Sequence, residues 1–493
     1  MPLLLGIDIG TTGTKSIVAD ANGKLIATDY KAYGFVSEKA GYVEQDPEDW
    51  WSAVKITVKN CLKNCPAGDV IALSLSTQGA TLVPVDRRGE KTRNAVVWMD
   101  SRAGRIGKNL NEKYGTDYFY NKTGWQLANC FNLLQILWMK ENEPEVFDKT
   151  YKFLSVIDYI NYKLTGRFAI DITNACITQL FNIIQEDWDE DILSFCGIGR
   201  EQLPEVVKTG EEIGTLTPEA AAQLGLRTDV KVISGAQDQY MAAVGNGVLS
   251  AGEALLSCGT SWCLTCILDK PLFDNKSYFA AARHAVEGLW AAFAYSPTGG
   301  AAFEWVRKNV LPVWADGELE GYGEIEKQVE NIRPGSDGLT FLPHFAGMLF
   351  PKKRVDAKAN IVGLDLKHTR YHIARAVMEG SVFDMKMILD ALEKKGGSLG
   401  QLKALGGATK NRTWMQMAAD ILGVKIIVPR FADVPALGAV IAAGTGAGLF
   451  SGFLEGYKKI GPDTDEAVPD TEKQKEYTKI YEEYKRNFDL INP

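Results

Sequence analysis

The chain has no strongly basic segment. It carries a net charge of −8 over 493 residues, and its densest basic run is only Lys352, Lys353 and Arg354. A nucleic-acid-binding protein is expected to present a basic face, whereas three adjacent basic residues are typical of a solvated loop. We therefore predict no nucleic-acid partner.

The chain also lacks the patterns of export and membrane insertion. Its opening, "MPLLLGIDIG", has no basic residues ahead of the apolar stretch, unlike a signal peptide. The apolar run over residues 436–454 is interrupted repeatedly by glycine, which favours tight helix packing over a membrane span. We predict a cytoplasmic protein with no membrane partner.

Cysteine is sparse and scattered. Of the eight cysteines, only Cys263 and Cys266 form a C-x-x-C pattern, within "SWCLTCIL". This segment is predicted as a strand, where residues three apart face opposite sides, so a shared metal ion or disulfide is not expected. We interpret the cysteines as small core thiols.

The length exceeds one ordinary core and indicates two or more domains. The opening predicts three strands, "LLLGIDIG", "SIVAD" and "LIATDY", with a hairpin at Asn22-Gly23. A helix is predicted over 46–64, with Asp46 as N-cap and Pro47 at its first position. The run "DVIALSLST" then predicts a buried strand. This alternation indicates a layered α/β domain.

The opening pattern recurs near the middle of the chain. Both "LLLGIDIGTTGTKSIVAD" and "EALLSCGTSWCLTCILD" place Gly-Thr and a small hydroxyl residue between apolar strands. We interpret this as a duplication, with an N-terminal domain over 1–248 and a C-terminal domain over 249–493. Backbone N–H groups of two facing hairpins could hold a polyphosphate in a cleft. A Walker-type P-loop is disfavoured, because Thr14 replaces the glycine required before Lys15.

Several motifs, in order along nearly the whole chain, resemble the FGGY family of carbohydrate kinases. They are "GIDIGTTGTK", "GYVEQDPEDWW" (similar to xylulose kinases), "STQGATLVPVD", "VVWMDSRA", "SGAQDQYMAAVG", "SCGTSW", "HIARAVMEGSVFDM" and "ALGGATKNRTWMQMAADILG". The resemblance implies an α/β architecture, the duplicated ribonuclease-H-like (actin-like ATPase) fold, with two domains around a central cleft. Sugar is expected on the N-terminal side and nucleotide on the C-terminal side.

Asp238 is a lone charge between an expected buried strand, ending at Val232-Ile233, and an expected helix from Tyr240 to Val244. A buried charge needs a partner, water or a chemical role. The resemblance implies that Asp238 is the catalytic base, which takes the proton of the acceptor hydroxyl during phosphoryl transfer. The alternative is a helix N-cap, and both roles can coexist.

Asp8 lies between Ile7 and Ile9 and so faces away from their side of the strand. The resemblance implies that Asp8 helps to bind Mg²⁺ at the phosphates of ATP, since this ion prefers carboxylate, phosphate and water oxygens. A carboxylate capping the turn is the alternative. Thr11, Thr12 and Lys15 are expected near the γ-phosphate, although a lysine in a turn is more often solvated.

The remaining nucleotide-side residues are also carried over from the resemblance. They are Gly259 and Thr260 in the second phosphate hairpin, the pair Gly299 and Gly300, and Gly406, Gly407 and Asn411 in the adenosine segment. Each glycine could instead serve a turn, and Asn411 could cap a helix.

On the sugar side, the expected substrate-binding residues are Thr77, Gln78, Trp98, Asp100, Asp238 and Gln239. Xylulose kinases usually have Met-His, Trp-Asn-Asp and Asp-Asn at the positions of Thr77-Gln78, Trp98-Met99-Asp100 and Asp238-Gln239. Glycerol kinases typically have Arg-Glu where Gly79-Ala80 stand, which disfavours glycerol. Trp98 could also be a core residue.

The sequence thus predicts an ATP- and Mg²⁺-dependent kinase for a small-molecule sugar, with a ketopentose such as D-xylulose as acceptor and D-xylulose 5-phosphate as product. Ribulose, L-xylulose, a hexulose or erythritol remain alternative acceptors, and a homodimer is left open. The rival from another class is an actin- or Hsp70-like ATPase without a sugar substrate.

Overall fold

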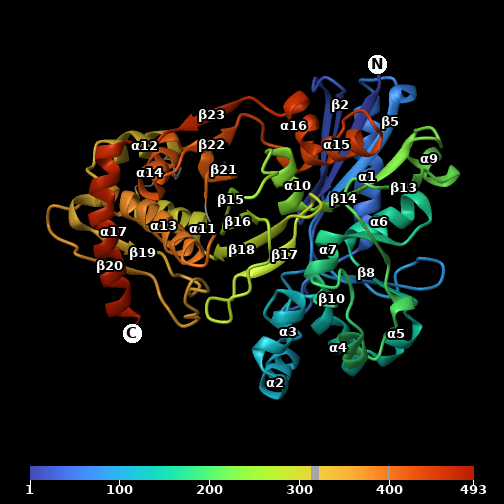
Figure 1. The fold of residues 1–493 in the computed structure, drawn as a ribbon, viewed down its shortest axis with the longest axis horizontal. Helices are drawn as coiled ribbons and strands as arrows, with labels where there is room; N and C mark the ends of the chain where they lie inside the picture. The colour runs from blue at the N-terminus through green and yellow to red at the C-terminus, as the bar shows by residue number, and fades with distance from the viewer. Residues whose placement is uncertain (312–320, 398, 493) are drawn as a thin grey trace.

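Two β-sheets, one from each half of the chain, form the framework of the computed structural model, which describes residues 1–311, 321–397 and 399–492 (Figure 1). The strands of the N-terminal sheet are β1 (Leu3–Ile9), β2 (Gly13–Asp20), β3 (Leu25–Ala32), β5 (Val70–Thr77), β13 (Glu212–Thr215) and β14 (Lys231–Gln237). Their order is β13-β14-β5-β1-β2-β3. β1, β2 and β3 form an antiparallel meander, and β5 and β14 continue parallel on the other side of β1.

The C-terminal sheet repeats this plan. Its strands are β15 (Glu253–Cys258), β16 (Trp262–Leu268), β17 (Ala280–Arg283), β18 (Trp290–Ser296), β21 (Gln401–Leu405), β22 (Ile426–Pro429) and β23 (Thr464–Ala467). β15, β16 and β18 form the antiparallel meander, and β21 and β22 follow in parallel beside β15. The predicted duplicated ribonuclease-H-like fold is confirmed.

Helices cover the sheets of both halves. Those of the first half are α1 (Pro47–Leu62), α2 (Gly104–Tyr114), α3 (Thr116–Thr123), α4 (Asn132–Asn142), α5 (Pro144–Lys149), α6 (Val156–Thr165), α7 (Ile172–Ile177), α8 (Glu190–Cys196), α9 (Pro218–Leu224) and α10 (Asp238–Gly245). Those of the second are α11 (Gly299–Asn309), α12 (Tyr322–Glu330), α13 (Arg370–Glu393), α14 (Arg412–Leu422), α15 (Val434–Gly446), α16 (Phe453–Ile460) and α17 (Thr471–Ile491).

Short two-stranded pairings complete the regular structure. They join β4 (Glu44–Gln45) to β7 (Ala95–Val96), β6 (Val83–Val85) to β8 (Lys152–Leu154), β9 (Ala169–Asp171) to β12 (Glu205–Val207), β10 (Phe181–Asn182) to β11 (Asp187–Trp188), and β19 (Thr340–Leu342) to β20 (Asn360–Val362).

Local sequence signals place several of these elements. The predicted helix over 46–64 is α1, and the Asp46 side chain caps it by accepting a hydrogen bond from the Glu48 N–H at 2.9 Å. Val54 and Val58 on this helix are fully buried, as are Leu4 and Ile7 on β1. Burial of each such side chain contributes roughly 1.5–3 kcal/mol, so the apolar pattern itself holds α1 against the sheet.

The glycine-rich helix α15 crosses back from the second half of the chain and packs on the N-terminal sheet and on α10 (Figure 1). A Cβ added at Gly438 would lie 2.0 Å from the Met241 carbonyl oxygen, and one at Gly6 would lie 2.2 Å from the Ala436 oxygen. The glycines therefore permit backbone-to-backbone contact, which is the tight packing predicted for 436–454. No helix among the described residues is long and apolar enough to cross a membrane.

All eight cysteines are free thiols, and Cys263 and Cys266 do not pair. Five are buried, which fits the expected core role, but Cys65, Cys130 and Cys263 are partly exposed. The core interpretation is therefore wrong for Cys130, in a loop, and Cys263, on β16, because both lie on the wall of the cavity described below.

Candidate functional site

The first hairpin places Asp8 near the end of β1, beside the neighbouring strand β5. Its carboxylate accepts a hydrogen bond from the Ser76 hydroxyl at 2.7 Å. Burial raises the pKa of Asp8 to about 6, with the Ser76 hydrogen bond and the charge of Lys15 opposing the shift and the charge of Asp433 adding to it. Asp8 therefore lies among other charges rather than merely capping a turn.

Lys15 is held by an ion pair to Asp433, the residue immediately before α15. The solvated-turn alternative for this lysine is wrong, because the side chain is engaged across the two halves of the chain. Asp433 was not predicted as a site residue. Its local sequence, "FADVP", gives no chemical signal, and only the fold brings it to the hairpin. Thr12 lies exposed at the hairpin tip.

Asp238 is the first residue of α10, directly after β14, which runs on to Gln237 rather than ending at Ile233. The helix cap is Gln237, whose side chain accepts a hydrogen bond from the Gln239 N–H at 3.1 Å. The N-cap alternative for Asp238 is therefore wrong. Gln237 is itself held by its N–H, which donates to the Thr173 hydroxyl at 2.9 Å.

The Asp238 carboxylate accepts a hydrogen bond from the Gln237 side-chain amide at 2.6 Å. Burial, and then the negative charge of Asp8, raise the pKa of Asp238 to about 7, while hydrogen bonds from Gln239 and Gln237 oppose the shift. A carboxyl group with a pKa near neutrality can exchange a proton with a nearby hydroxyl, as a general base requires.

The second hairpin, between β15 and β16, packs against the beginning of α11. The N–H of Gly300 donates to the Gly259 oxygen at 3.2 Å, and the N–H of Ala301 donates to the Thr260 oxygen at 2.9 Å. A Cβ at Gly300 would lie 2.2 Å from the Gly259 oxygen, and one at Gly299 would meet the Trp262 ring at 2.2 Å. Glycine is required at both positions for this close approach.

The segment after β21 reaches the same hairpin. Gly406 has a φ of 104°, and a Cβ there would lie 2.7 Å from the Cys258 oxygen. Gly407 then opens a short 3₁₀ turn, Gly407–Lys410. The Asn411 side chain accepts a hydrogen bond from the Trp414 N–H at 2.8 Å, so its helix-cap alternative is confirmed. The fold thus gathers all three predicted nucleotide-side segments.

A cavity of about 560 Å³ lies between the halves and is lined by residues of both. Of the predicted residues it brings together five: Thr11, Gln78, Trp98, Asp238 and Gln239. The other predicted residues are not part of its wall; they are Asp8, Thr12, Lys15, Thr77, Asp100 and the nucleotide-side residues.

Gln78 and Gln239 line this cavity, and each has one buried side-chain oxygen with no partner among the described residues. The Gln78 amide nitrogen donates to the Gln45 side-chain oxygen at 3.0 Å, but its own Oε1 has no partner among the described residues. The Gln239 Oε1 is likewise buried and unpartnered within that part of the chain. The neighbouring Thr77 is fully buried away from the cavity. An amide oxygen can accept hydrogen bonds, so these two groups are the candidates for hydrogen bonds from a ligand.

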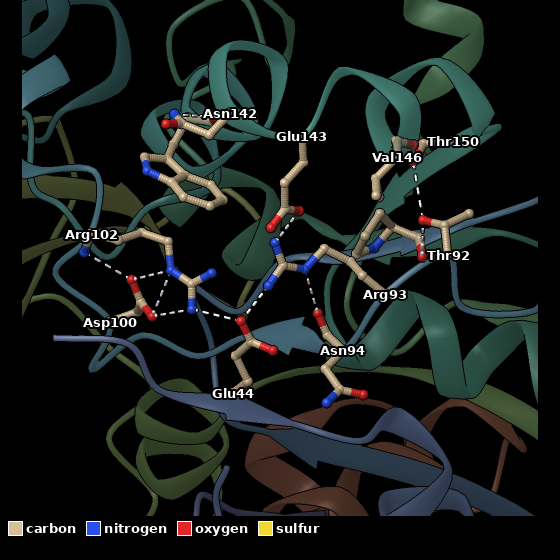
Figure 2. A network of polar contacts seen from close by, with 12 residues as sticks. Glu44, Thr92, Arg93, Asn94, Asp100, Arg102, Asn142, Glu143, Val146 and Thr150 are labelled. Atoms are coloured by element: carbon tan, nitrogen blue, oxygen red, sulfur yellow. Dashed lines mark hydrogen bonds and ion pairs between the residues drawn. The ribbon is translucent and has the colours of Figure 1, made fainter. Parts of the chain in front are cut away.

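Trp98 and Asp100, both predicted to bind the substrate, have different surroundings: Trp98 lines the cavity and Asp100 does not. Trp98 is 44% exposed, so its core alternative is wrong, and its indole N–H donates to the Thr11 hydroxyl at 3.1 Å. Asp100 is buried and ion-paired to Arg102 (Figure 2). It also accepts a hydrogen bond from the Val43 N–H at 2.6 Å. Both oxygens are engaged by the protein, so Asp100 holds the loop that carries Trp98 rather than facing the cavity.

The cavity also has lining residues that sequence reasoning missed. Trp125, Phe131, Phe293 and Tyr295 form much of an aromatic wall, and Thr265 lies on β16. Alternation along "SWCLT" could have placed Thr265 on the face of Ser261 and Cys263. Trp125 lies in a loop with no periodic signal, so only the fold reveals it.

Both halves of the chain match models of known protein domains. A model described as the N-terminal domain of the FGGY family of carbohydrate kinases matches residues 3–245, and one for the C-terminal domain matches residues 254–447.

Relatives of several specificities are similar over most of the chain. A xylulose kinase of Bacillus subtilis is 31% identical, covering 98% of this chain and 96% of the relative. A glycerol kinase of Chloroflexus aurantiacus is 32% identical, covering 90% of each, and a gluconokinase of B. subtilis is 28% identical, covering 96% and 93%. The solved structure of a ligand-bound xylulose kinase from Lactobacillus acidophilus has a TM-score of 0.93 at 27% identity, covering 100% and 99%.

Proposed function

The chain is a carbohydrate kinase that belongs to the FGGY family, and we propose that its acceptor is a ketopentose such as D-xylulose, which would give D-xylulose 5-phosphate. The rival ATPase without a sugar substrate is wrong, because both halves match the carbohydrate-kinase models and not merely a shared phosphate hairpin.

The observation that carries the mechanism is the position of Asp238 on the cavity wall, at the start of α10, with a pKa of about 7 raised first by burial. In our proposal its carboxylate accepts the proton of the acceptor hydroxyl as that oxygen bonds to the γ-phosphorus of ATP and the bond to the β-phosphate oxygen breaks. Gln237 orients the carboxylate through its 2.6 Å hydrogen bond. General-base assistance of this kind is typically worth about 10²–10⁴-fold in rate.

We further propose that the phosphates of ATP lie between the two hairpins, with Thr11, Thr12 and Lys15 on one side and Gly259 and Thr260 on the other. Gly299 and Gly300 and the segment Gly406, Gly407 and Asn411 would hold the rest of the nucleotide. The boundary at 248/249 is part of this proposal, since the cavity takes its wall from both sides of it.

Asp8 is the residue we propose for Mg²⁺, and Asp433 lies near enough for its charge to affect Asp8. No group of three or more His, Cys, Asp or Glu side chains could enclose a metal ion in the described part of the chain. One or two carboxylates with phosphate and water oxygens fit Mg²⁺, which usually binds in this way. When bound, the ion would neutralise phosphate charge.

The choice of ketopentose is supported by the similarity to xylulose kinases over nearly the full chain. Gluconokinase and glycerol kinase relatives show that the family match alone does not select the sugar. Gly79 and Ala80 replace the Arg-Glu of glycerol kinases, which disfavours glycerol. Ribulose, L-xylulose, a hexulose and erythritol are the alternatives. The homodimer and the cytoplasmic location stay predictions.

ADP release with Mg²⁺-ATP tests the proposal across D- and L-xylulose, D- and L-ribulose, ketohexoses, erythritol, ribitol and glycerol. The variant Asp238→Asn should lose about 10²–10⁴-fold in kcat with the best acceptor. Asp229→Asn, a matched change at an exposed surface aspartate, should have no effect. Turnover that survives in Asp238→Asn would remove the base role, and a preference for a polyol over every ketopentose would refute the acceptor class.

A further inference from the structure

Two residues on the wall of the cavity have a buried polar group with no hydrogen-bond partner in the described part of the chain. Thr265 is 1% exposed and its hydroxyl has no hydrogen-bond partner among the described residues; the same holds for the buried indole nitrogen of Trp125. Both residues line the cavity. An unsatisfied buried polar group costs free energy unless something else bonds to it, and a ligand in the cavity is one group that could do so.

Thr265 lies on β16, the strand that begins at the second phosphate hairpin. β16 leaves the second hairpin at Trp262, and Ser261, Cys263 and Thr265 follow one another along the cavity. The charge of Asp238 reaches Cys263, where it adds to the effect of burial in raising the pKa of that thiol to about 11. Thr265 lies two residues farther from the hairpin, about 6.6 Å along the strand.

Trp125 reaches the same place from the other half of the chain. Its ring packs on Phe293, with centroids 5.5 Å apart, and on Phe131, with centroids 5.2 Å apart. Phe293 lies on β18 directly opposite Thr265 in the antiparallel pairing. Phe293 is therefore the shared neighbour of both residues: it pairs with Thr265 across the strands and packs against the Trp125 ring.

The charges around the cavity indicate a neutral ligand. Among the lining residues that the structure describes there is no arginine or histidine, and the two lysines, Lys276 and Lys353, are both exposed. The unsatisfied groups are a hydroxyl, an indole N–H and the carbonyl oxygens of Gln78 and Gln239. A buried carboxylate would need a cation beside it, and the cations of this wall are two exposed lysines.

We propose that Thr265 and Trp125 form a hydroxyl-binding subsite that selects neutral acceptors longer than a three-carbon polyol. The inference rests on the proposed function and adds the residues that set its specificity. In this proposal one acceptor hydroxyl lies at Asp238 and another at Thr265, which lies farther along β16 than Cys263, so we expect a five-carbon ketopentose to reach both groups and three-carbon glycerol to reach one. A sugar acid would place its carboxylate against uncharged groups.

Steady-state kinetics with D-xylulose, D-ribulose, glycerol and D-gluconate test this subsite. Thr265→Val removes the hydroxyl at nearly constant volume and should raise KM for the ketopentose about 5- to 150-fold while leaving KM for ATP unchanged. Thr265→Ser keeps the hydroxyl and should stay near the wild-type KM. If Thr265 serves packing alone, the order reverses, with the serine variant impaired and the valine variant normal.

Trp125→Phe, which removes the indole N–H, should also raise KM for the ketopentose. Trp305→Phe, at a 44% exposed tryptophan away from the cavity, is the matched control and should not. Ketopentose turnover with a wild-type KM in Thr265→Val would overturn this inference alone. A preference for glycerol or D-gluconate, or no turnover with any acceptor, would overturn the proposed acceptor as well.

Discussion

Replacing Arg102 decides whether Asp100 supports the site or binds the acceptor. Arg102 lies between two carboxylates (Figure 2), and the side chains of Arg102 and Asp100 are each 1% exposed. Its Nε and Nη2 donate to Asp100 at 2.9 and 2.7 Å, and Nη2 also donates to Glu44 at 2.7 Å. The guanidinium lies 3.9 Å from the Tyr42 ring centre. This is a buried, bidentate ion pair with little solvent access.

Removing one partner of such a pair costs about 3–5 kcal/mol, because the other charge stays buried and unpaired. We expect Arg102→Met to reduce the free energy of unfolding by that amount, since methionine retains contact with Tyr42 while Asp100 loses its counter-ion. Adding Asp100→Asn removes the stranded charge, and the amide oxygen can still accept from Val43. The double variant should therefore be more stable than Arg102→Met, with a net loss of about 1–2 kcal/mol.

Urea unfolding followed by tryptophan fluorescence measures these differences. Arg105→Met is the matched control, because Arg105 is 74% exposed and its ion pair with Glu141 should contribute under about 1 kcal/mol. Arg102→Met as stable as this control would refute the reasoning. So would an Asp100→Asn variant with normal stability and a raised KM for the acceptor, which would return Asp100 to substrate binding.

Three further predictions concern the base and two glycines. Because the pKa of Asp238 is raised to about 7, first by burial and then by the charge of Asp8, kcat/KM for the acceptor should fall as the pH is lowered through 7 and the ionised base is lost; a pH–rate profile measures this. Gly300→Ala should raise KM for ATP in steady-state kinetics, because the new Cβ would lie 2.2 Å from the Gly259 oxygen. Gly438→Ala, whose Cβ would lie 2.0 Å from the Met241 oxygen, should lower the free energy of unfolding in urea by about 1–3 kcal/mol.

Gly34→Ala serves as control for both glycine variants, since a Cβ there meets nothing within 4 Å. A pH-independent kcat/KM across neutrality would contradict the base assignment. Equal behaviour of Gly300→Ala and Gly34→Ala in ATP kinetics would show that the hairpin does not contact the nucleotide. Wild-type stability in Gly438→Ala would mean that α10 and α15 can separate without cost.

The parts of the fold that the sequence predicted are those determined by near neighbours. Asn22-Gly23 directs a hairpin because Gly23 adopts a φ of 85°, and Asp46 caps α1 through a residue two positions away. The two Gly-Thr turns are likewise flanked by their own strands. Such patterns require no knowledge of the distant chain, so the hairpins, α1 and the duplication could all be derived before the fold was known.

Several alternatives that the sequence left open are decided by contacts that could not be predicted from it. Lys15 is paired with Asp433, from the other half of the chain. The apolar context of Trp98 left a core position open beside the predicted role in substrate binding, but Asp100 and Arg102 tether the loop and the indole N–H donates to Thr11. At the start of α10, Gln237 took the cap because its longer side chain folds back to the Gln239 N–H. Lys15 thus depends on a residue far away in the sequence, whereas the cap of α10 is a local contact in which glutamine, not a favoured N-cap residue, takes the place expected for aspartate.

The return of α15 to the N-terminal sheet has a consequence for how the chain is made. Translation delivers β1 first, but residues 434–446, which cover one face of its sheet, leave the ribosome only near the end of synthesis. Until then the apolar face of the sheet is exposed to solvent, and exposed apolar surface promotes aggregation or chaperone binding. A fragment ending at residue 248 would keep this face permanently uncovered, so the two halves are structurally interdependent although each has its own sheet.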